Sequence, residues 1–346
     1  MISLRFLERD VAIALSSDSH LMSTLNATDT ITYSPALTIV PTYECFNRCT
    51  YCNFRVAPQQ DRWLSPAALQ QQLMRARSHG LIEVLVLSGE VHSASHRRAA
   101  WFQHILQICK VVLQQGLLPH TNVGLVSEAE MAQLKAVNAS MGLMLEQVTP
   151  KLLKSVHRHA PSKVPEQRLA QLEQSGRLRI PFTTGLLLGI GESANDRIDT
   201  LRAIAHCHDR WGHIQEVILQ PHQPGTRQME AEASFSPQAL AEFVKVARQH
   251  LPAEIVLQIP PNLVTDRQYV LKAIANGVTD LGGLGPKDEV NPDYDHPTPS
   301  AMRQLLETHN YDLRPRLPIY PQYDSWLSSE VKPIVKDWRN RLQNTG

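Results

Sequence analysis

The sequence predicts an α/β fold, a (β/α)8 barrel of the TIM type in which helices wrap a closed parallel sheet. Short runs of β-branched residues and leucine alternate with longer segments of helical period, and the alternation recurs about eight times along 346 residues. Such alternation is typical of parallel strands joined by helices, and about eight units favour closure into a barrel. Barrels of this length often form one domain, and a hydrophobic content of 42% suffices for its core.

The first half of the chain contains four predicted strands. They are expected at residues 36–40, 83–87, 120–123 and 138–145. The first helix begins at Ser65 and Pro66, since serine is a good N-cap and proline suits the first turn. The second helix covers 97–115, where a glycine ends it. The third begins at Ser127, which forms a capping box with Glu130.

The second half contains four more predicted strands and a tail. The strands are expected at residues 179–188, 216–219, 254–259 and 277–281. Residues 1–34 are rich in Ser, Thr and Asp and predict an N-terminal helical extension. Residues 311–346 contain four prolines and predict a tail that packs on the barrel base, with a short helix near Trp338. We therefore predict one barrel over residues 35–310 with two decorations.

Composition excludes several classes of partner. The formal charge of +1 and the pI near 7.8 give no broad electrostatic footprint for nucleic acid or an anionic membrane. No run of about eighteen or more apolar residues occurs, so no membrane span is expected. Nothing at the N-terminus resembles a secretory signal. The cysteine motif at residues 45–52 predicts thiols that hold iron, and such thiols require a reducing compartment. The expected location is the cytoplasm.

Cys45, Cys49 and Cys52 form a Cys-x3-Cys-x2-Cys motif directly after the first predicted strand. Thiolates bind soft metals, and three of them can hold three irons of a cubane 4Fe-4S cluster and leave the fourth iron open. A structural zinc site is the alternative, but it usually needs four ligands, and only Cys109 and Cys207 remain. The odd number of cysteines disfavours a set of disulfides. We expect Cys109 to be a buried small apolar side chain. Cys207 lies between two histidines, but adjacent side chains on a helix point apart, so we expect no metal site there.

Polar and glycine-rich sequences follow the next predicted strands, where a barrel gathers its chemistry at one common mouth. These sequences are Ser88-Gly89-Glu90, Thr121-Asn122, Glu146-Gln147 and Gly189-Ile190-Gly191-Glu192. Each of them alone is explained as well by a turn or a helix cap. Their shared position at strand ends favours a functional site.

The cysteine motif, Ser88-Gly89-Glu90 and the glycine-rich end of the fifth strand resemble the radical S-adenosylmethionine (SAM) superfamily over about residues 36–285. The resemblance implies a 4Fe-4S cluster whose open iron binds the amino and carboxylate groups of SAM. An electron from the cluster then cleaves SAM to a 5'-deoxyadenosyl radical. The resemblance also places Tyr51 against the adenine, Gly89 and Glu90 at the methionine amino group, and Gly189 and Gly191 near the adenine.

Longer stretches resemble subunit 1 of the deazaflavin (FO) synthase family. They are residues 138–146, 156–161, 180–192, 213–217, 260–263 and 280–283. The implied activity is a radical cyclase and ammonia-lyase that converts 5-amino-5-(4-hydroxybenzyl)-6-(D-ribitylimino)uracil into 7,8-didemethyl-8-hydroxy-5-deazariboflavin. The implied partners are this small-molecule substrate, the second synthase subunit that joins tyrosine to the ribityl-uracil, and a reductant such as ferredoxin or flavodoxin. The alternatives are a related radical SAM enzyme, such as that second subunit or a menaquinone-pathway enzyme, and a metal-stabilised scaffold without turnover.

Several side chains are candidates for catalysis and binding. We expect His120, Glu146 and His157 to act as acid or base, because histidine and carboxylate side chains commonly move protons. Hydrogen-bonding partners for the nucleoside and the substrate are expected to point inward from strand ends, and they are Asn122, Ser140, Glu146, Thr184 and Gln220.

Overall fold

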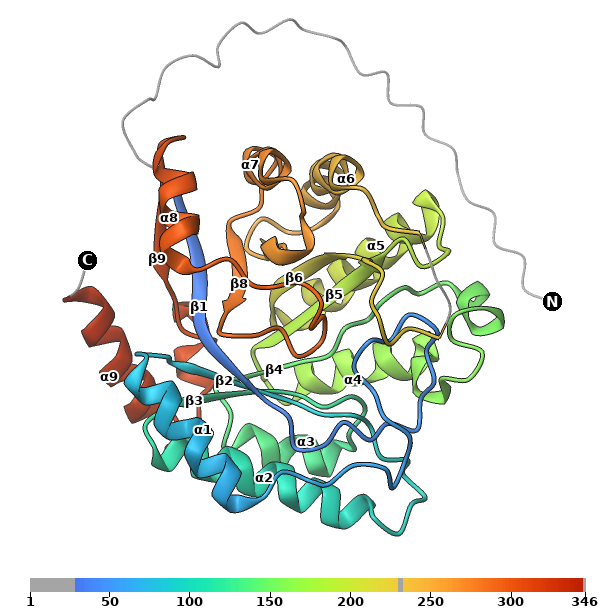
Figure 1. Cartoon of the computed structure of the whole chain (residues 1–346), viewed down its shortest axis with the longest axis vertical. Helices are drawn as coiled ribbons and strands as arrows, with labels where there is room; N and C mark the ends of the chain where they lie inside the picture. The colour runs from blue at the N-terminus through green and yellow to red at the C-terminus, as the bar shows by residue number, and fades with distance from the viewer. Residues whose placement is uncertain (1–28, 230–232, 345–346) are drawn as a thin grey trace, which may run out of the picture.

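The computed structural model describes residues 29–229 and 233–344 and contains a closed parallel barrel (Figure 1). Its strands are β1 (Asp29–Ile39), β2 (Glu83–Leu87), β3 (Leu118–Asn122), β4 (Ser140–Gly142), β5 (Phe182–Leu188), β6 (Ile214–Pro221), β7 (Val256–Gln258) and β8 (Asp280–Leu284). The order runs from β2 through β8 to β1, and pairing of β1 with β2 closes the sheet. The predicted (β/α)8 barrel is therefore confirmed.

Helices cover the outside of the barrel (Figure 1). They are α1 (Pro66–Ser78), α2 (Arg98–Gln114), α3 (Glu128–Lys135), α4 (Pro165–Arg177), α5 (Ala194–Trp211), α6 (Pro237–His250), α7 (Arg267–Ala275) and α8 (Pro299–Glu307). The predicted caps are present: Ser65 accepts a hydrogen bond from the Ala68 amide, and Ser127 forms the full capping box with Glu130. No helix in the described part of the chain is long and apolar enough to span a bilayer.

Several strand boundaries differ from the prediction. The first strand begins at Asp29 rather than at residue 36, because its first half pairs with an additional strand, β9 (Tyr311–Pro315). The fourth strand is shorter than 138–145, since the chain leaves regular pairing before Glu146, which has a φ of +63°. The fifth begins at Phe182, after Arg179 at a φ of +51°, and the eighth shifts to 280–284, after Gly277 at +118°.

Two segments, residues 1–34 and 311–346, flank the predicted barrel. The predicted helical extension falls mainly on residues 1–28, which lie outside the described residues; its last residues, 29–34, belong to β1. The tail contains β9, a 3-10 helix η4 (Pro321–Trp326) and α9 (Lys332–Gln343). Trp338 of α9 donates a hydrogen bond of 2.8 Å from its ring nitrogen to the Gly116 carbonyl. The tail thus packs on the base of the barrel, at the end of α2.

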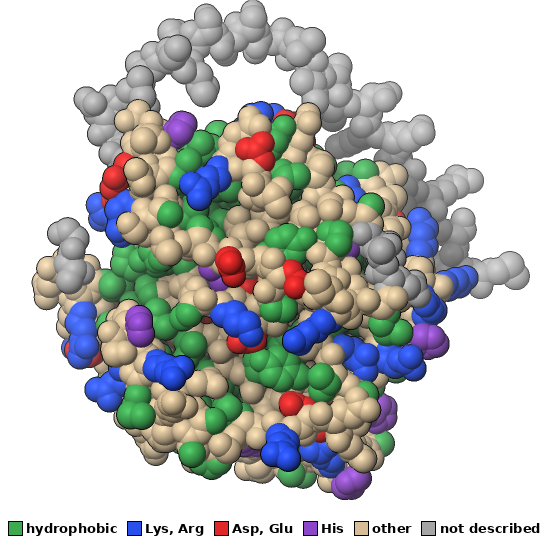
Figure 2. All heavy atoms as spheres, viewed as in Figure 1, with side chains coloured by type: hydrophobic (Ala, Val, Ile, Leu, Met, Phe, Trp, Pro, Cys, Tyr) green, Lys and Arg blue, Asp and Glu red, His purple; other side chains and the backbone are tan. Residues whose placement is uncertain are grey.

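Polar side chains occupy part of the barrel interior, where branched apolar residues usually dominate. Glu83, His120, Glu216 and Asp280 are all buried there on four different strands. On the face of the molecule seen in Figure 2, Lys and Arg side chains occur together with Asp and Glu side chains. A buried polar group is costly unless it is hydrogen-bonded, so the interior cluster indicates a binding site rather than a packing core.

Candidate active site

The three cysteines of the motif line one cavity of about 300 Å³ at the carboxyl ends of the strands, and we call it the cysteine cavity. Their loop is held by backbone hydrogen bonds, from Cys45 N to Val56 O (3.1 Å) and from Cys52 N to Cys49 O (3.2 Å). A third bond joins Phe46 N to Glu90 O (3.0 Å), which ties the loop to the end of β2. All three cysteines are free thiols.

The donor set fits a cubane cluster with one open iron. Cys109 is buried against Thr121, as predicted, and Cys207 is buried on α5; neither lines the cavity. Within residues 29–229 and 233–344, no three His, Cys, Asp or Glu side chains are grouped to hold a single metal ion. Burial raises the pKa of Cys45 to about 11 and that of Cys49 to about 12. Metal binding would therefore release protons from these thiols.

Glycine at position 89 lets the end of β2 approach the cysteine loop. A Cβ at Gly89 would lie 2.1 Å from the Glu44 carbonyl oxygen, and the Gly89 amide donates to Thr42 O at 2.9 Å. No side chain fits this crossing. Gly89 and the neighbouring Glu90 consequently border the cavity beside Cys45.

Glu90 and Asn122 extend the cavity wall from β2 and β3. The Glu90 carboxylate accepts a hydrogen bond from the Leu125 amide at 3.3 Å. It lies over Gly124, whose φ is +79° and where a Cβ would come within 2.2 Å of the Glu90 side chain. The loop after β3 is therefore shaped around this carboxylate.

A buried ion pair also lines the cavity. Lys163 Nζ is 2.5 Å from Glu146 Oε1, and both side chains line the cavity. Burial raises the pKa of Glu146, but Lys163 and Arg168 outweigh it and hold that pKa below its usual value. Arg168 donates to the Met144 carbonyl at 2.7 Å and lies 3.9 Å from Glu90. The cavity thus combines carboxylates with two buried cations, which suits a zwitterionic ligand.

Tyr51 closes another side of the cavity. Its ring packs against an apolar cluster that includes Leu187 and Ile190, and its hydroxyl is 2.9 Å from His157 Nε2. His157 lies behind Tyr51 and does not line the cavity; burial and Lys163 lower its pKa to about 3. From this position His157 can hold the Tyr51 ring in place through the hydrogen bond to its hydroxyl.

The glycine-rich end of β5 reaches the site only indirectly. Gly189 and Gly191 have φ values of +92° and +103°, and neither lines the cavity. The amides of Gly189 and Ile190 donate to the Glu192 carboxylate at 2.7 and 2.8 Å. The turn is thereby fixed so that Ile190 packs on Tyr51.

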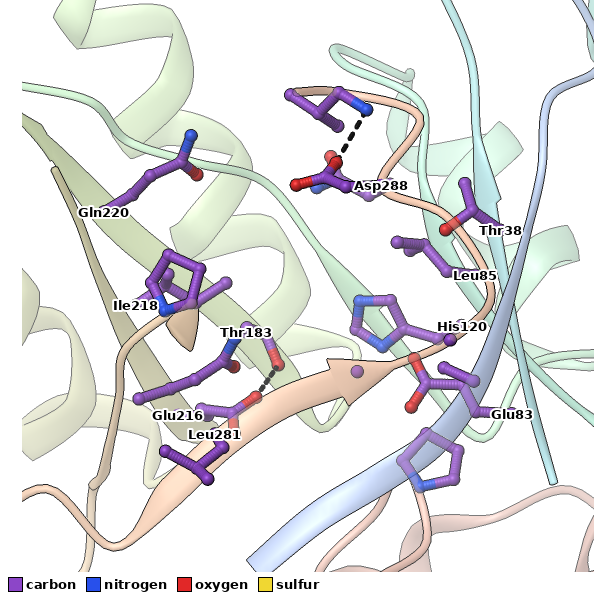
Figure 3. A pocket seen from close by; sticks show the side chains of 18 of the residues that line it. Thr38, Glu83, Leu85, His120, Thr183, Glu216, Ile218, Gln220, Leu281 and Asp288 are labelled. Carbon is purple, nitrogen blue, oxygen red and sulfur yellow. Dashed lines mark hydrogen bonds between the residues drawn. The ribbon is translucent and has the colours of Figure 1, made fainter. Parts of the chain in front are cut away.

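A second cavity of about 170 Å³ lies inside the barrel (Figure 3), and we call it the core cavity. It shares wall residues with the cysteine cavity, so the two adjoin. The shared residues are Leu85, Asn122, Met144, Ile218, Gln220, Val290 and Asn291. Deeper in the barrel the core cavity is lined by Glu83, His120, Thr183, Glu216, Gln258 and Arg316, among others. Its base is thus mostly polar.

His120 has a fixed tautomer in the core cavity. Its Nδ1 lies 2.6 Å from Ser140 Oγ, and that hydroxyl donates to the Pro318 carbonyl at 2.5 Å. A carbonyl only accepts, so the serine proton is committed and His120 Nδ1 must be the donor. Burial and the charge of Arg316 lower the pKa of His120 to about 3. His120 is therefore neutral, and Nε2 carries a free lone pair.

Arg316, from the tail, crosses the base of the core cavity. It donates to Asp280 at 2.5 and 2.7 Å and to Glu216 at 2.7 Å. Burial raises the pKa of Glu216 to about 8; Arg316 opposes this shift and Asp280 adds to it. No local motif marks Arg316 in the sequence, because it reaches the site by tertiary packing.

Comparisons with known proteins identify the family. The family model of the Radical SAM superfamily matches residues 39–204. A protein of Trichormus variabilis named 7,8-didemethyl-8-hydroxy-5-deazariboflavin synthase is 58% identical over 308 residues, covering 89% of this chain and 91% of that protein. A protein of the same name from Synechococcus elongatus is 55% identical over 314 residues, covering 91% and 94%. The chain belongs to this synthase family.

Solved structures show the same fold in more distant proteins. The FeFe-hydrogenase maturase of Carboxydothermus hydrogenoformans superposes with a TM-score of 0.68 at 14% identity, over 92% of this chain and 78% of that chain. Methylornithine synthase superposes with a TM-score of 0.65 at 14% identity, over 87% of each chain. At this identity the likeness supports the barrel fold alone.

Within the synthase family fold, the candidate residues from the sequence fall into three groups. The structure brings one group together around the cysteine cavity: Cys45, Cys49, Cys52, Tyr51, Gly89, Glu90, Asn122 and Glu146. His120 lines the core cavity, and Gln220, like Asn122, lines both cavities. Ser140, His157, Thr184, Gly189 and Gly191 line neither cavity, and Thr184 instead donates to the Leu143 carbonyl. Lys163, Arg168 and Arg316 were absent from the sequence-based set.

Proposed function

We propose that the chain is a deazaflavin synthase: a radical SAM cyclase and carbon–nitrogen (ammonia) lyase. The substrate would be 5-amino-5-(4-hydroxybenzyl)-6-(D-ribitylimino)uracil, and the products would be the deazaflavin FO, ammonia, 5'-deoxyadenosine and methionine. The observation that carries this proposal is the 58% identity to a named deazaflavin synthase over 89% of the chain. The adjoining cavities support it, since one suits a cluster with its nucleoside and the other a polar substrate.

Cys45, Cys49 and Cys52 would hold the 4Fe-4S cluster. When bound there, the cluster and SAM would supply a 5'-deoxyadenosyl radical able to abstract a hydrogen atom. Lys163 and Arg168 offer positive charge to a carboxylate, and Glu90 offers negative charge to an ammonium group. Lys163 pairs with Glu146, and Arg168 lies 3.9 Å from Glu90, so the cavity offers groups of both charges that would hold the two ends of an amino acid.

Proton handling falls to residues of the core cavity. Ring closure and loss of ammonia require proton transfers at nitrogen and at the phenol. His120 presents a neutral Nε2 lone pair to the cavity and can accept a proton or a hydrogen bond. Glu146 is held as a carboxylate by Lys163, so it would act by charge rather than by proton transfer.

The proposal implies further partners. The substrate would come from the second synthase subunit, which joins tyrosine to the ribityl-uracil, and an electron carrier such as ferredoxin or flavodoxin would reduce the cluster. We place the enzyme in the cytoplasm, because cysteines that bind iron need a reducing compartment.

Anaerobic reconstitution followed by reduction tests the proposal. The protein should bind about four irons, as a cubane cluster requires, and should convert the hydroxybenzyl adduct into a fluorescent deazaflavin with release of 5'-deoxyadenosine. Cys49→Ser should abolish cluster binding, whereas Cys207→Ser, a buried cysteine outside the site, should retain it. Consumption of tyrosine by this chain alone would instead indicate the activity of the second subunit.

A further inference from the structure

The two ends of the core cavity differ in chemistry. Glu83 is the first residue of β2 and Glu216 lies near the start of β6, so both are at the base of the barrel, with Arg316 from the tail. Asn122 ends β3 and Gln220 lies near the end of β6, so both are at the boundary with the cysteine cavity. A ligand in the core cavity therefore meets one set of groups at the base and another at the boundary.

Hydrogen-bond acceptors predominate at the base. Glu83 and His120 are diagonal neighbours on β2 and β3, since Leu85 pairs with His120 and Glu83 with Leu118. Both side chains face the core cavity (Figure 3). The Ser140 contact leaves His120 with an acceptor at Nε2, and the Glu83 carboxyl group adds two oxygens. With about two acceptor sites per carboxyl oxygen and one at the nitrogen, Glu83 and His120 together offer about five acceptor sites on one wall, of which the Ser34 hydroxyl can use one.

The Arg316 cation at the base is already engaged. Arg316 donates to Asp280 twice, to Glu216 and to the Leu317 carbonyl, which uses four of the five N–H groups of a guanidinium. An anionic ligand group would have to displace these carboxylates. The base therefore suits a neutral group with several hydroxyl donors, not a phosphate or carboxylate.

The boundary suits flat rings instead. Its apolar members, Leu85, Met144, Ile218 and Val290, come from four different elements of the barrel and its loops. Amide side chains stand among them at Asn122, Gln220 and Asn291, and each offers both donors and acceptors. That combination matches the edge of a uracil and the face of a phenol.

We propose that the core cavity binds the substrate by its polyol chain, with the ribityl hydroxyls donating to Glu83 and His120 at the base and the two rings at the boundary. This inference rests on the proposed function for the identity of the substrate. It assigns the orientation: the chain points toward the barrel base and the rings toward the cysteine cavity. Glu83 and His120 then determine specificity for a hydroxylated chain.

Calorimetric binding to the reconstituted, unreduced protein with SAM tests the orientation without turnover. The probes are the hydroxybenzyl adduct and an analogue with an ethyl group in place of the ribityl chain. The wild-type protein should bind the ethyl analogue at least about tenfold more weakly, since two or more hydrogen bonds are lost and each is worth roughly 0.5–1.5 kcal/mol. Glu83→Gln and His120→Phe should weaken binding of the ribityl adduct by a similar factor and leave binding of the ethyl analogue within about twofold.

Glu173→Gln is the matched control, because this carboxylate bonds Trp211 outside the barrel and should leave both affinities unchanged. Equal binding of both probes by the wild-type protein, or equal losses for both probes in Glu83→Gln, overturns the orientation, as does failure of the wild-type protein to bind the adduct. Selective binding without deazaflavin formation on reduction would support the orientation and refute the proposed reaction.

Discussion

His120 Nδ1 lies 2.6 Å from the hydroxyl of Ser140, and this contact decides which ring nitrogen faces the core cavity. The Ser140 hydroxyl donates its own hydrogen bond to the Pro318 carbonyl, so this relay of hydrogen bonds begins in the tail and ends at the core cavity. A residue on β4 that lines neither cavity thereby controls the chemistry of one that does. Ser140 is a positioning residue in this arrangement.

Ser140→Ala should allow both neutral tautomers of His120 to form. The substitution leaves His120 Nδ1 without its partner, while the Pro318 carbonyl keeps its hydrogen bond from Gln215 Nε2 at 3.0 Å. We expect a cost of about 1–3 kcal/mol in the free energy of unfolding. Nitrogen NMR of labelled histidine should show a mixture of tautomers at His120 where the parent protein shows one. Ser175→Ala, a buried serine bonded only to the Leu172 carbonyl, is the control and should leave the His120 signals unchanged. A single unchanged tautomer in Ser140→Ala would refute the relay.

Lys163→Met should destabilise the protein more than the double substitution Lys163→Met with Glu146→Gln. The single change leaves Glu146 buried without its cation, which costs about 3–5 kcal/mol, whereas a neutral pair of similar volume recovers much of this. Denaturant unfolding under anaerobic conditions measures both. Release of 5'-deoxyadenosine should fall in both variants, since each lacks the positive charge in the cysteine cavity. Equal stability of the single and double variants would show that the ion pair is unimportant.

Local sequence predicts the cysteine cavity well because its parts follow strand ends, which a barrel gathers by construction. Cys45, Glu90, Asn122 and Glu146 are separated along the chain, yet each comes directly after or at the end of a strand and lines the same cavity. Lys163 ends a three-residue 3-10 helix (Pro161–Lys163) before α4, which is too short for a periodicity to indicate its direction. It reaches the site only because that segment folds over the cysteine loop, with Arg48 N bonded to His159 O at 2.7 Å.

The core cavity was less predictable for a related reason. Its base depends on Arg316, which follows β9 in the tail and pairs with carboxylates on β6 and β8. Inward-facing carboxylates at the start of a strand are indistinguishable in sequence from surface residues near a turn. Ser140 was expected to point inward as a binding residue, but it lines neither cavity, and its partner in the tail, Pro318, could not be inferred from strand ends alone. Such pairings are set by three-dimensional packing.

Gly142→Ala should displace the His120 ring. A Cβ at this position would lie 2.9 Å from His120 Nε2 and 3.1 Å from the Thr183 carbonyl oxygen, closer than atoms normally pack. We expect a loss of about 1–3 kcal/mol in unfolding free energy from overpacking, together with weaker substrate binding. In a His120→Ala background the same glycine substitution should cost less, because the ring it strikes is gone. An equal cost in both backgrounds would place the clash elsewhere.

His213→Phe should reduce the stability that the protein loses as the pH falls below about 6.5. His213 is fully buried beside Phe182, and burial, with a further effect of His208, lowers its pKa to about 3. The unfolded chain, with a histidine pKa near about 6.5, binds this proton at a higher pH than the folded chain does. Stability therefore falls as pH decreases from about 6.5 to 3, by up to about 1.4 kcal/mol per pH unit for one group. Unfolding measured at pH 7 and pH 5 should show a smaller difference in the variant; an unchanged difference would exclude His213 as the cause.

Glu216→Gln should reduce the stability that the protein loses as the pH rises toward about 8. The pKa of Glu216 is raised to about 8 by burial, against Arg316 and with Asp280, whereas an unfolded glutamate titrates near about 4.3. The folded protein thus retains a proton that the unfolded chain has lost, and its stability falls as pH rises through this window. Glutamine keeps the shape and the contact with Arg316 but does not titrate, so the variant should lose less stability between pH 5 and pH 8. Chemical unfolding at both values measures this, with Glu242→Gln, an exposed residue on α6, as the control. An identical pH dependence in the parent and Glu216→Gln would mean that Glu216 is ionised in the folded protein and that the base of the core cavity carries one more negative charge.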